Sequence, residues 1–375
     1  MLIRGRVLFP DGALRDGEVA IEKGVIAEVR QVKEAPAQII SPGWIDLQVN
    51  GAFGHDFTLA PWTMPAVAAQ LPRTGVTAFL PTIITSPLDT YPRALNTIGE
   101  LLPAAIDRPG AAARILGLHL EGPYLAHERR GAHNPAFLRT PTVPIQDGLL
   151  GPAASQSSLV RLMTLAPELP NALHAIHDLC AQHVVVSLGH SHATYDQAIA
   201  GIDAGARYGT HLFNAMSPLQ HREPGMVGAL LTDPRITVGI IPDGVHFHPS
   251  ILSWLIRAKG PDHITLVTDA MAAAGLGAGE FALGDRRVIV DQVSARLENG
   301  TLAGSILTLD QGVRKLVEWG ACSLEAALIM ASTTPARVLG LDGLGRIETG
   351  CVGDLVVLDQ NLDIKQTIIA GEVVA

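Results

Sequence analysis

Eight short apolar runs rich in Val, Ile and Leu recur along the middle of this chain, separated by segments with helical periodicity. Runs of this kind are typical of parallel strands buried on both faces, with crossover helices between them. They cover residues 44–49, 76–84, 115–120, 160–165, 184–188, 208–212, 236–241 and 264–268. Eight such units predict a (β/α)₈ barrel of the α/β class, in which catalytic groups lie at the carboxyl ends of the strands.

The two ends of the chain have a different texture, with short alternating segments broken by glycine turns. This pattern indicates strands at residues 3–9, 17–21, 24–29, 345–347, 354–358 and 366–369. We expect residues 1–43 and 345–375 to pair into one small β-sandwich domain, which would bring the termini together. Residues 44–344 would then form the barrel.

Composition excludes several classes of protein. With 47% hydrophobic and 17% charged residues, the chain has enough apolar material for a large core. A net charge of −9 argues against wrapping nucleic acid, which needs a concentrated basic surface. The three cysteines are far apart and form no CxxC, and we find neither a long uninterrupted apolar stretch nor an export signal. We therefore expect a cytoplasmic protein that does not bind membranes.

Polar residues gather where the predicted strands end. Glu121, His190 and His211 follow strands three, five and six. One carboxylate with two imidazoles and a water is a known catalytic zinc set. Asp269, after strand eight, is then free to act as a base. Because His192 lies two residues after His190, on the same face if the strand continues, either histidine could be the ligand.

Several motifs in these strand ends occur together and in order. The runs HLEGPYL, GAHNP, LGHSHAT, THLFNAM, REPG, PDGVH and VTDA resemble those of the N-acetylglucosamine-6-phosphate deacetylase family of the amidohydrolase superfamily. The resemblance extends over nearly the whole chain, including the terminal β segments. It implies metal-dependent hydrolysis of the N-acetyl amide of N-acetylglucosamine 6-phosphate, which yields glucosamine 6-phosphate and acetate.

The resemblance also implies a role for individual residues. Glu121, His190 and His211 match the metal ligands, with the ligand immediately after glycine favouring His190 over His192. Asp269 matches the catalytic aspartate. His133 matches a histidine that contacts the acetamido group. The positions that match the sugar-phosphate site are Asn214, Ala215, Arg222 and His246. In the family the arginine reaches the neighbouring subunit's site, so a homodimer is expected.

The chain departs from many amidohydrolases at the end of strand one. Where these carry His-x-His for a second metal, this chain has Gln48 and Asn50, and amides are poor ligands for transition metals. The bridging lysine of other branches is also missing, because no lysine occurs between Lys33 and Lys259. We therefore expect one divalent ion per chain, zinc first, with iron, manganese and cobalt able to accept the same ligands.

Two other functions fit parts of the pattern. Another amidohydrolase, such as a D-aminoacylase or a cyclic-amide hydrolase, would keep the barrel and differ in its pocket. A non-catalytic scaffold would keep the barrel alone, but it has no physical need for this polar set at the barrel mouth. The glycine-rich stretch at residues 275–279 could suggest a phosphate loop, but without a helix signal or a Lys-Ser/Thr pair we interpret it as a flexible turn.

Overall fold

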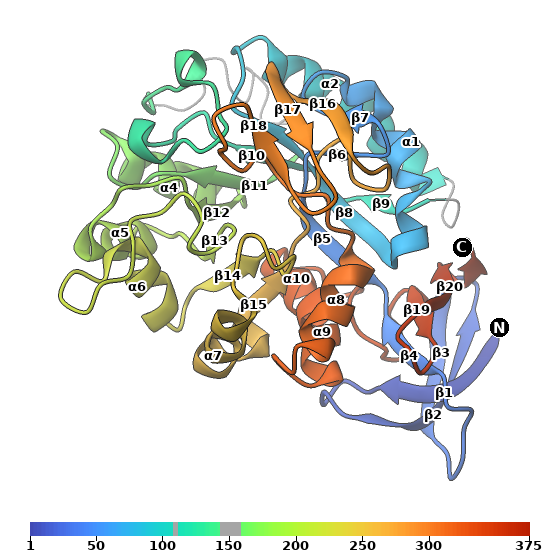
Figure 1. The fold of residues 1–375 in the computed structure, drawn as a ribbon. Coiled ribbons are helices and arrows are strands. Elements are labelled where there is room, and N and C mark those ends of the chain that lie inside the picture. The colour runs from blue at the N-terminus through green and yellow to red at the C-terminus, as the bar shows by residue number, and fades with distance from the viewer. Residues whose placement is uncertain (108–111, 143–158) are drawn as a thin grey trace.

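All eight apolar runs form parallel strands of one sheet in the computed structural model, which describes residues 1–107, 112–142 and 159–375. In sheet order these are β5 (Trp44–Val49), β8 (Val76–Ile84), β10 (Leu118–Glu121), β11 (Val160–Leu165), β12 (Val185–Leu188), β13 (Tyr208–Gly209), β14 (Thr237–Ile240) and β15 (Ile264–Leu266). The short strand β9 (Arg114–Ile115) also pairs with β8. Figure 1 shows these strands surrounded by helices.

The sheet closes on itself between its first and last strands. The Asp269 N–H donates to the Gln48 carbonyl at 2.9 Å, and the Asn50 N–H donates to the Ala270 carbonyl at 2.8 Å. All nine residues of β8 are buried, as expected for a strand covered on both faces. The (β/α)₈ prediction is therefore confirmed, and the closing bonds bring the ends of strands one and eight together.

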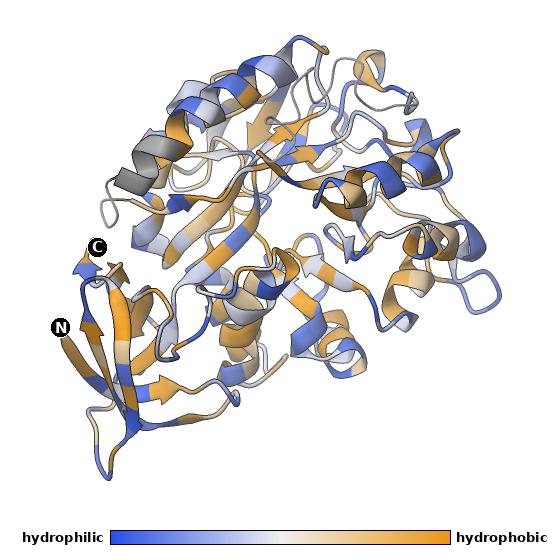
Figure 2. Cartoon of the chain, turned by 180° about the vertical axis from the view of Figure 1, so that it is seen from behind, coloured by the Kyte–Doolittle hydropathy of each residue, from blue (hydrophilic) through white to orange (hydrophobic). Residues whose placement is uncertain are grey.

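Helices follow the strands around the outside of the barrel. They are α1 (Met64–Ala68), α2 (Thr90–Asp107), α4 (Ala172–Ala181), α5 (Tyr195–Asp203), α6 (Gly225–Thr232), α7 (Pro249–Lys259), α8 (Leu309–Glu318), α9 (Leu324–Ala331) and α10 (Thr333–Val338). Local sequence explains several starts: Thr194 and Gln197 form a capping box at α5, and Ser323 caps α9. Hydrophilic and hydrophobic residues alternate along the helices in Figure 2, as one-sided burial requires.

In the described ranges, five short 3₁₀ helices and a two-stranded hairpin occupy the loops. The 3₁₀ helices are η1 (Pro61–Thr63), η2 (Leu71–Thr74), η3 (His127–Arg129), η4 (Pro135–Phe137) and η5 (Pro261–His263), and the hairpin pairs β6 (Gly51–Ala52) with β7 (His55–Asp56). Both η3 and η4 follow β10 and carry the residues after Glu121 towards the barrel mouth.

A three-stranded antiparallel sheet that the sequence analysis did not anticipate follows β15. It contains β16 (Gly279–Leu283), β17 (Arg286–Val290) and β18 (Ala295–Leu297). Its buried side chains pack against Ile84, Ala132 and Met271 at the barrel rim. Residues 275–278, interpreted as a turn, do form the connection into β16, with Gly275 and Gly277 at positive φ. Figure 1 shows this sheet above the strands.

Strands from both ends of the chain form one small sheet beside the barrel, as expected, with the order β21-β20-β19-β4-β1-β2-β3. The strands are β1 (Leu2–Leu8), β2 (Leu14–Glu22), β3 (Val25–Gln31), β4 (Ile39–Pro42), β19 (Leu355–Leu358), β20 (Ile364–Ile369) and β21 (Glu372–Val373). The sheet has an apolar core of its own. The Ile26 N–H of β3 donates to the Cys351 carbonyl at 2.8 Å and so ties this strand to the segment before β19. The N- and C-termini lie near each other in Figure 1.

The small sheet differs from the sequence prediction at two places. Residues 345–347 form no strand, because Gly345 takes a positive φ of 71° and Ile347 fills the core without pairing. Conversely, β4 was not predicted, although it joins β1 to β19 and so links the two ends of the chain. An ion pair between Arg114 and Asp354, at 2.9 Å, connects this sheet to the barrel. No helix within the described ranges is long and apolar enough to cross a membrane.

Candidate active site

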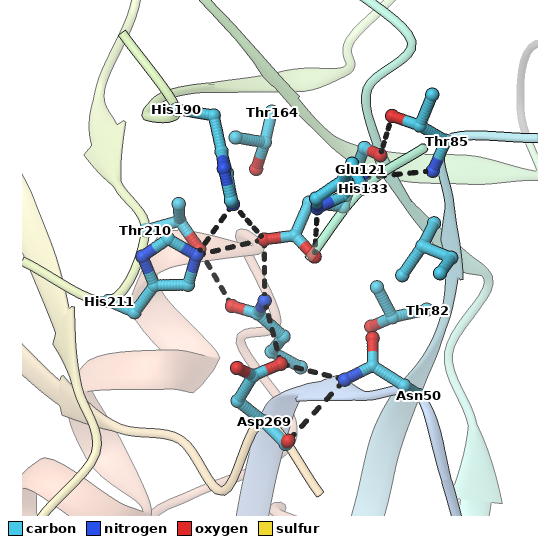
Figure 3. Close-up of polar contacts among 12 residues, drawn as sticks. Asn50, Thr82, Thr85, Glu121, His133, Thr164, His190, Thr210, His211 and Asp269 are labelled. Atoms are coloured by element: carbon cyan, nitrogen blue, oxygen red, sulfur yellow. Dashed lines mark hydrogen bonds and ion pairs between the residues drawn. The ribbon is translucent and has the colours of Figure 1, made fainter. Parts of the chain in front are cut away.

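Four predicted site residues meet at the carboxyl ends of the barrel strands. Glu121 ends β10, while His190, His211 and Asp269 follow β12, β13 and β15 within three residues. All four side chains are buried. Figure 3 shows them converging from different strands, as the fold requires of a site at this end of a barrel.

Glu121, His190 and His211 form one tight cluster. Glu121 Oε1 lies 3.2 Å from His190 Nε2 and 3.0 Å from His211 Nε2, and the two nitrogens are 3.0 Å apart. The sequence left His190 and His192 as alternatives; the structure places His190 in the cluster, whereas His192 is exposed outside it. Among the described residues this is the one group of three or more ligand-type side chains close enough to share an ion.

The chemistry of the cluster fits a divalent cation. His190 Nδ1 lies 2.9 Å from the Arg129 carbonyl, so that nitrogen carries the proton and Nε2 presents its lone pair to the cluster. Burial lowers the pKa of His190 to about 4, which keeps the imidazole neutral as a ligand must be. Burial alone would lower the pKa of His211, but the Glu121 carboxylate raises it. The surroundings of Glu121 and His211 therefore favour a positive charge.

Glu121 remains ionised in this buried position. Burial by itself would raise its pKa, but contacts with His133, His190 and His211 hold the pKa well below its ordinary range. His133 approaches the other carboxylate oxygen, with Nε2 at 3.6 Å from Oε2. The His133 Nδ1 accepts the Thr85 N–H at 3.3 Å, so Nε2 is the nitrogen that carries a proton into the site.

Two amide side chains surround Asp269. Asn50 Nδ2 donates to Asp269 Oδ1 at 2.7 Å, and Gln48 Nε2 donates to the same oxygen at 3.1 Å. Gln48 Nε2 also donates to Glu121 Oε1 at 2.8 Å, and its Oε1 accepts from the Thr210 hydroxyl at 2.6 Å. The sequence identified Gln48 and Asn50 only as missing ligands; the structure shows that both bind Asp269 and that Gln48 connects it to Glu121.

Asp269 is poised as a base by this environment. Burial raises its pKa to about 6, and the negative charge of Glu121 adds to the effect. Its Oδ2 has no hydrogen-bond partner among the described residues, so this oxygen is available to a substrate or a water. A carboxylate with a raised pKa and a free oxygen beside a cation site is suited to proton transfer.

Backbone strain is concentrated at the same strand ends. Five non-glycine residues in or next to the site have positive φ, a conformation that L-residues rarely adopt: His190, His211, Phe213, Ala215 and Asp269. Such residues persist only where the surrounding structure holds them in place, and they cluster at functional sites. Here the strained backbone aims two imidazoles and a carboxylate at one point.

A cavity of about 440 Å³ opens above these side chains. Of the residues matched to the sugar-phosphate site, Asn214, Ala215 and His246 line it, whereas Arg222 is exposed and lies outside the lining. His246 Nδ1 is 2.6 Å from the Asp243 carboxylate, which fixes its ring. The Asn214 side chain donates to the carbonyls of His211 and Leu212 and so stabilises the turn that holds Ala215.

Several lining residues were missed by the sequence analysis. Arg129 comes from η3, Leu283 ends β16, and β18 with the segment after it contributes Arg296, Gly300, Thr301, Leu302 and Gly304. Their position depends on how the β16–β18 sheet lies over the barrel, which no local pattern indicates. The basic pair at 129–130, directly before the GAHNP run, was a visible signal for the first of them.

Together the fold and the site define a class: (β/α)₈ barrel proteins with a carboxylate–histidine cation site and a separate buried carboxylate at the carboxyl ends of the strands. The chain belongs to the amidohydrolase family, whose model matches residues 39–374.

Curated relatives cover almost the entire chain. It is 41% identical to N-acetylgalactosamine-6-phosphate deacetylase of Escherichia coli O157:H7, over 98% of this chain and 97% of that protein. It is 40% identical to human N-acetylglucosamine-6-phosphate deacetylase, over 99% and 92% of the two chains. An aspartate-to-alanine mutant of the Mycobacterium smegmatis N-acetyl-D-glucosamine-6-phosphate deacetylase, solved with N-acetyl-D-glucosamine-6-phosphate, matches with a TM-score of 0.90 and 34% identity, over 100% and 99% of the two chains.

Proposed function

We propose that this chain hydrolyses the N-acetyl amide of N-acetylglucosamine 6-phosphate, giving glucosamine 6-phosphate and acetate. The observation that carries the proposal is Asp269, a buried carboxylate with a free Oδ2 next to the Glu121–His190–His211 cluster. Relatives over nearly the full length are deacetylases of amino-sugar phosphates. A D-aminoacylase or a cyclic-amide hydrolase is therefore not favoured, and neither is a non-catalytic scaffold.

Glu121, His190 and His211 would hold one divalent ion, which we propose to be zinc. When bound, such an ion polarises a carbonyl and lowers the pKa of a water. Iron, manganese and cobalt could bind the same donors. Gln48 and Asn50 stand where many other amidohydrolases carry two imidazoles, and both donate hydrogen bonds to Asp269. Neither side chain therefore offers an imidazole to a second ion on that side. Metal analysis should give one ion per chain, and two fully occupied ions would contradict this.

Asp269 and His133 would carry out the proton transfer and stabilise charge. Asp269 Oδ2 would accept the proton of the attacking water and then deliver it to the departing amine nitrogen, which must leave protonated. The His133 Nε2–H would donate to the amide oxygen as negative charge develops on it. Amide carbonyls are stable to water, so both contributions are needed.

The sugar phosphate would lie towards the turn at residues 214–215 and towards His246. Arg222 is exposed and outside its own cavity, so we propose that it reaches the neighbouring site of a homodimer. Mixing Arg222→Ala chains with Asp269→Asn chains tests this, because a heterodimer has one site with both defects and one with neither. Recovered activity supports the shared site; no recovery under demonstrated chain exchange confines Arg222 to its own subunit.

The domain division belongs to the same proposal. Residues 44–344 would form the catalytic barrel, and residues 1–43 with 345–375 a small β domain, built on the seven-stranded sheet, that supports it. Cys180, Cys322 and Cys351 are free. Free thiols persist in a reducing compartment, so we propose that the enzyme works in the cytoplasm.

The decisive experiment is acetate release from three sugars by protein of measured metal content. N-acetylglucosamine 6-phosphate, its 4-epimer N-acetylgalactosamine 6-phosphate and unphosphorylated N-acetylglucosamine separate the possibilities. We expect the highest kcat/KM for the first and a large loss without the phosphate. Equal turnover with and without the phosphate would favour another amidohydrolase, and preference for the 4-epimer would move the chain to the activity named for its relative from E. coli.

A further inference from the structure

The side chain of Arg129 lies at the cavity with its terminal nitrogens free. Arg129 Nε donates to His192 Nδ1 at 3.2 Å, and the residue lines the cavity. Within the described parts of the chain, neither Nη atom has a hydrogen bond or an ion pair. By contrast, Arg296, the other arginine of the lining, donates from Nε to the Ser294 hydroxyl and from Nη1 to the Gly300 carbonyl.

The loop that carries Arg129 lies against the turn at residues 214–215. Gly131 and Ala215 both line the cavity, and a Cβ added to Gly131 would lie 4.0 Å from the Ala215 Cβ, so the two segments lie close together there. His192, which holds the guanidinium, directly follows Ser191, whose N–H donates to the Ala215 carbonyl at 3.1 Å. The loop with Arg129 and the residue that holds its guanidinium therefore both adjoin the turn at which the proposed function places the sugar phosphate.

Charge balance shows why a cation is needed at this place. The chain carries a net charge of −9, and Glu121, Glu128 and Asp269 line the cavity. A dianionic phosphate is repelled by such surroundings unless fixed donors face it. A guanidinium with two free terminal nitrogens suits phosphate oxygens, which it can bind through two parallel hydrogen bonds.

We infer that Arg129 binds the substrate phosphate within its own subunit, and that His192 is the positioning residue that holds its guanidinium. This rests on the proposed function and extends it, because it assigns an arginine from the same chain in addition to Arg222. The interpretation also gives the second histidine of the LGHSHAT run a task distinct from that of His190.

A purely structural role for Arg129 makes a different prediction. Its carbonyl oxygen accepts from His190 Nδ1 at 2.9 Å, and a side-chain substitution keeps that oxygen. If the side chain only held the loop, its removal would disturb His190 and reduce metal content and turnover of every substrate alike. If it binds phosphate, removal affects the phosphorylated substrate alone.

The kinetic test compares Arg129→Ala, Arg129→Lys, His192→Ala and the control Arg130→Ala. Arg130 is the adjacent arginine, donates to the His127 carbonyl and does not line the cavity. Loss of the guanidinium–phosphate contact should raise KM for N-acetylglucosamine 6-phosphate at least about 10- to 100-fold in Arg129→Ala, with kcat, metal content and turnover of N-acetylglucosamine unchanged. The lysine and His192→Ala variants should show smaller increases, and Arg130→Ala none.

Calorimetric titration separates failure of this inference from failure of the proposed function. Glucosamine 6-phosphate and glucosamine are titrated into wild-type protein and Arg129→Ala. The inference is supported if wild type binds glucosamine 6-phosphate more tightly than glucosamine and Arg129→Ala binds the phosphorylated sugar about tenfold or more weakly than wild type. This result supports it even if the wild type hydrolyses no acetyl sugar. Equal affinity in both proteins overturns it while catalysis stands. Loss of metal or of kcat on both sugars, or no phosphate-dependent binding in the wild type, overturns it as well.

Discussion

Glu121 and Asp269 are both buried carboxylates at the same barrel mouth, yet their surroundings shift their pKa values in opposite directions. Imidazoles surround Glu121, and their contacts hold its pKa far below the ordinary range. Asp269 has two amides as partners, and burial raises its pKa to about 6. We call these the imidazole side (Glu121, His190, His211) and the amide side (Gln48, Asn50, Asp269). One barrel mouth therefore provides a binding place for a cation and, beside it, a carboxylate that can accept a proton.

The largest expected effect comes from breaking the imidazole side. Glu121→Gln keeps the shape but removes the negative charge that both imidazole Nε2 atoms face at 3.0–3.2 Å. We expect the metal content to fall from one ion per chain towards zero. Activity should fall further than it does on loss of a general base, which typically costs about 10²–10⁴-fold. Metal analysis and acetate release measure this. A variant that keeps its metal would show that the carboxylate is not a ligand.

Next in size is the loss of the base on the amide side. Asp269→Asn can still accept the hydrogen bonds from Gln48 and Asn50, but it cannot carry a proton on the second atom. We expect kcat to fall about 10²–10⁴-fold, with metal content and binding of glucosamine 6-phosphate unchanged. Near-wild-type kcat, with the asparagine verified by mass spectrometry, would assign the base to another residue.

A third prediction concerns Asp46, which lies beneath the amide side. Its carboxylate accepts from the Thr268 hydroxyl at 2.6 Å, and burial raises its pKa to about 7. In the unfolded chain the Asp46 carboxyl ionises near pH 4, whereas in the folded protein it stays protonated up to about pH 7. The free energy of unfolding therefore falls as the pH rises from about 4 to about 7, and it falls no further above that. Relative to wild type, Asp46→Asn should gain up to about 4 kcal/mol in free energy of unfolding across that interval.

Urea unfolding of both proteins between pH 4 and pH 8 measures this difference. At pH 4 both side chains are neutral, so the remaining difference reports only how the amide packs. A constant difference at every pH would mean that the Asp46 carboxyl ionises as readily in the folded barrel as in the unfolded chain.

The two sides of the mouth also differ in how well the sequence predicts them. Barrel strands are buried on both faces, so continuous apolar runs mark them, and the imidazole-side residues directly follow such runs. The role of Gln48 could not be predicted, because its partners Glu121 and Asp269 are 73 and 221 residues away in sequence. The strands β16–β18 were missed for a related reason: their burial alternates irregularly, and exposed charges such as Arg287 interrupt any apolar run.

The smallest effect is expected at Gln48, the residue that joins the imidazole side to the amide side. Gln48 gives one hydrogen to Glu121 and one to Asp269, while Thr210 holds its oxygen at 2.6 Å. Gln48→Met fills similar space without donors, and loss of such an outer partner typically costs about 10–100-fold in metal affinity or activity. Thr210→Val is the matched control: it removes the hydroxyl but leaves both donors, so we expect a loss below about tenfold. If Gln48→Met matches wild type in both metal affinity and kcat, the two sides work independently, and the amide only fills the place of the missing imidazole.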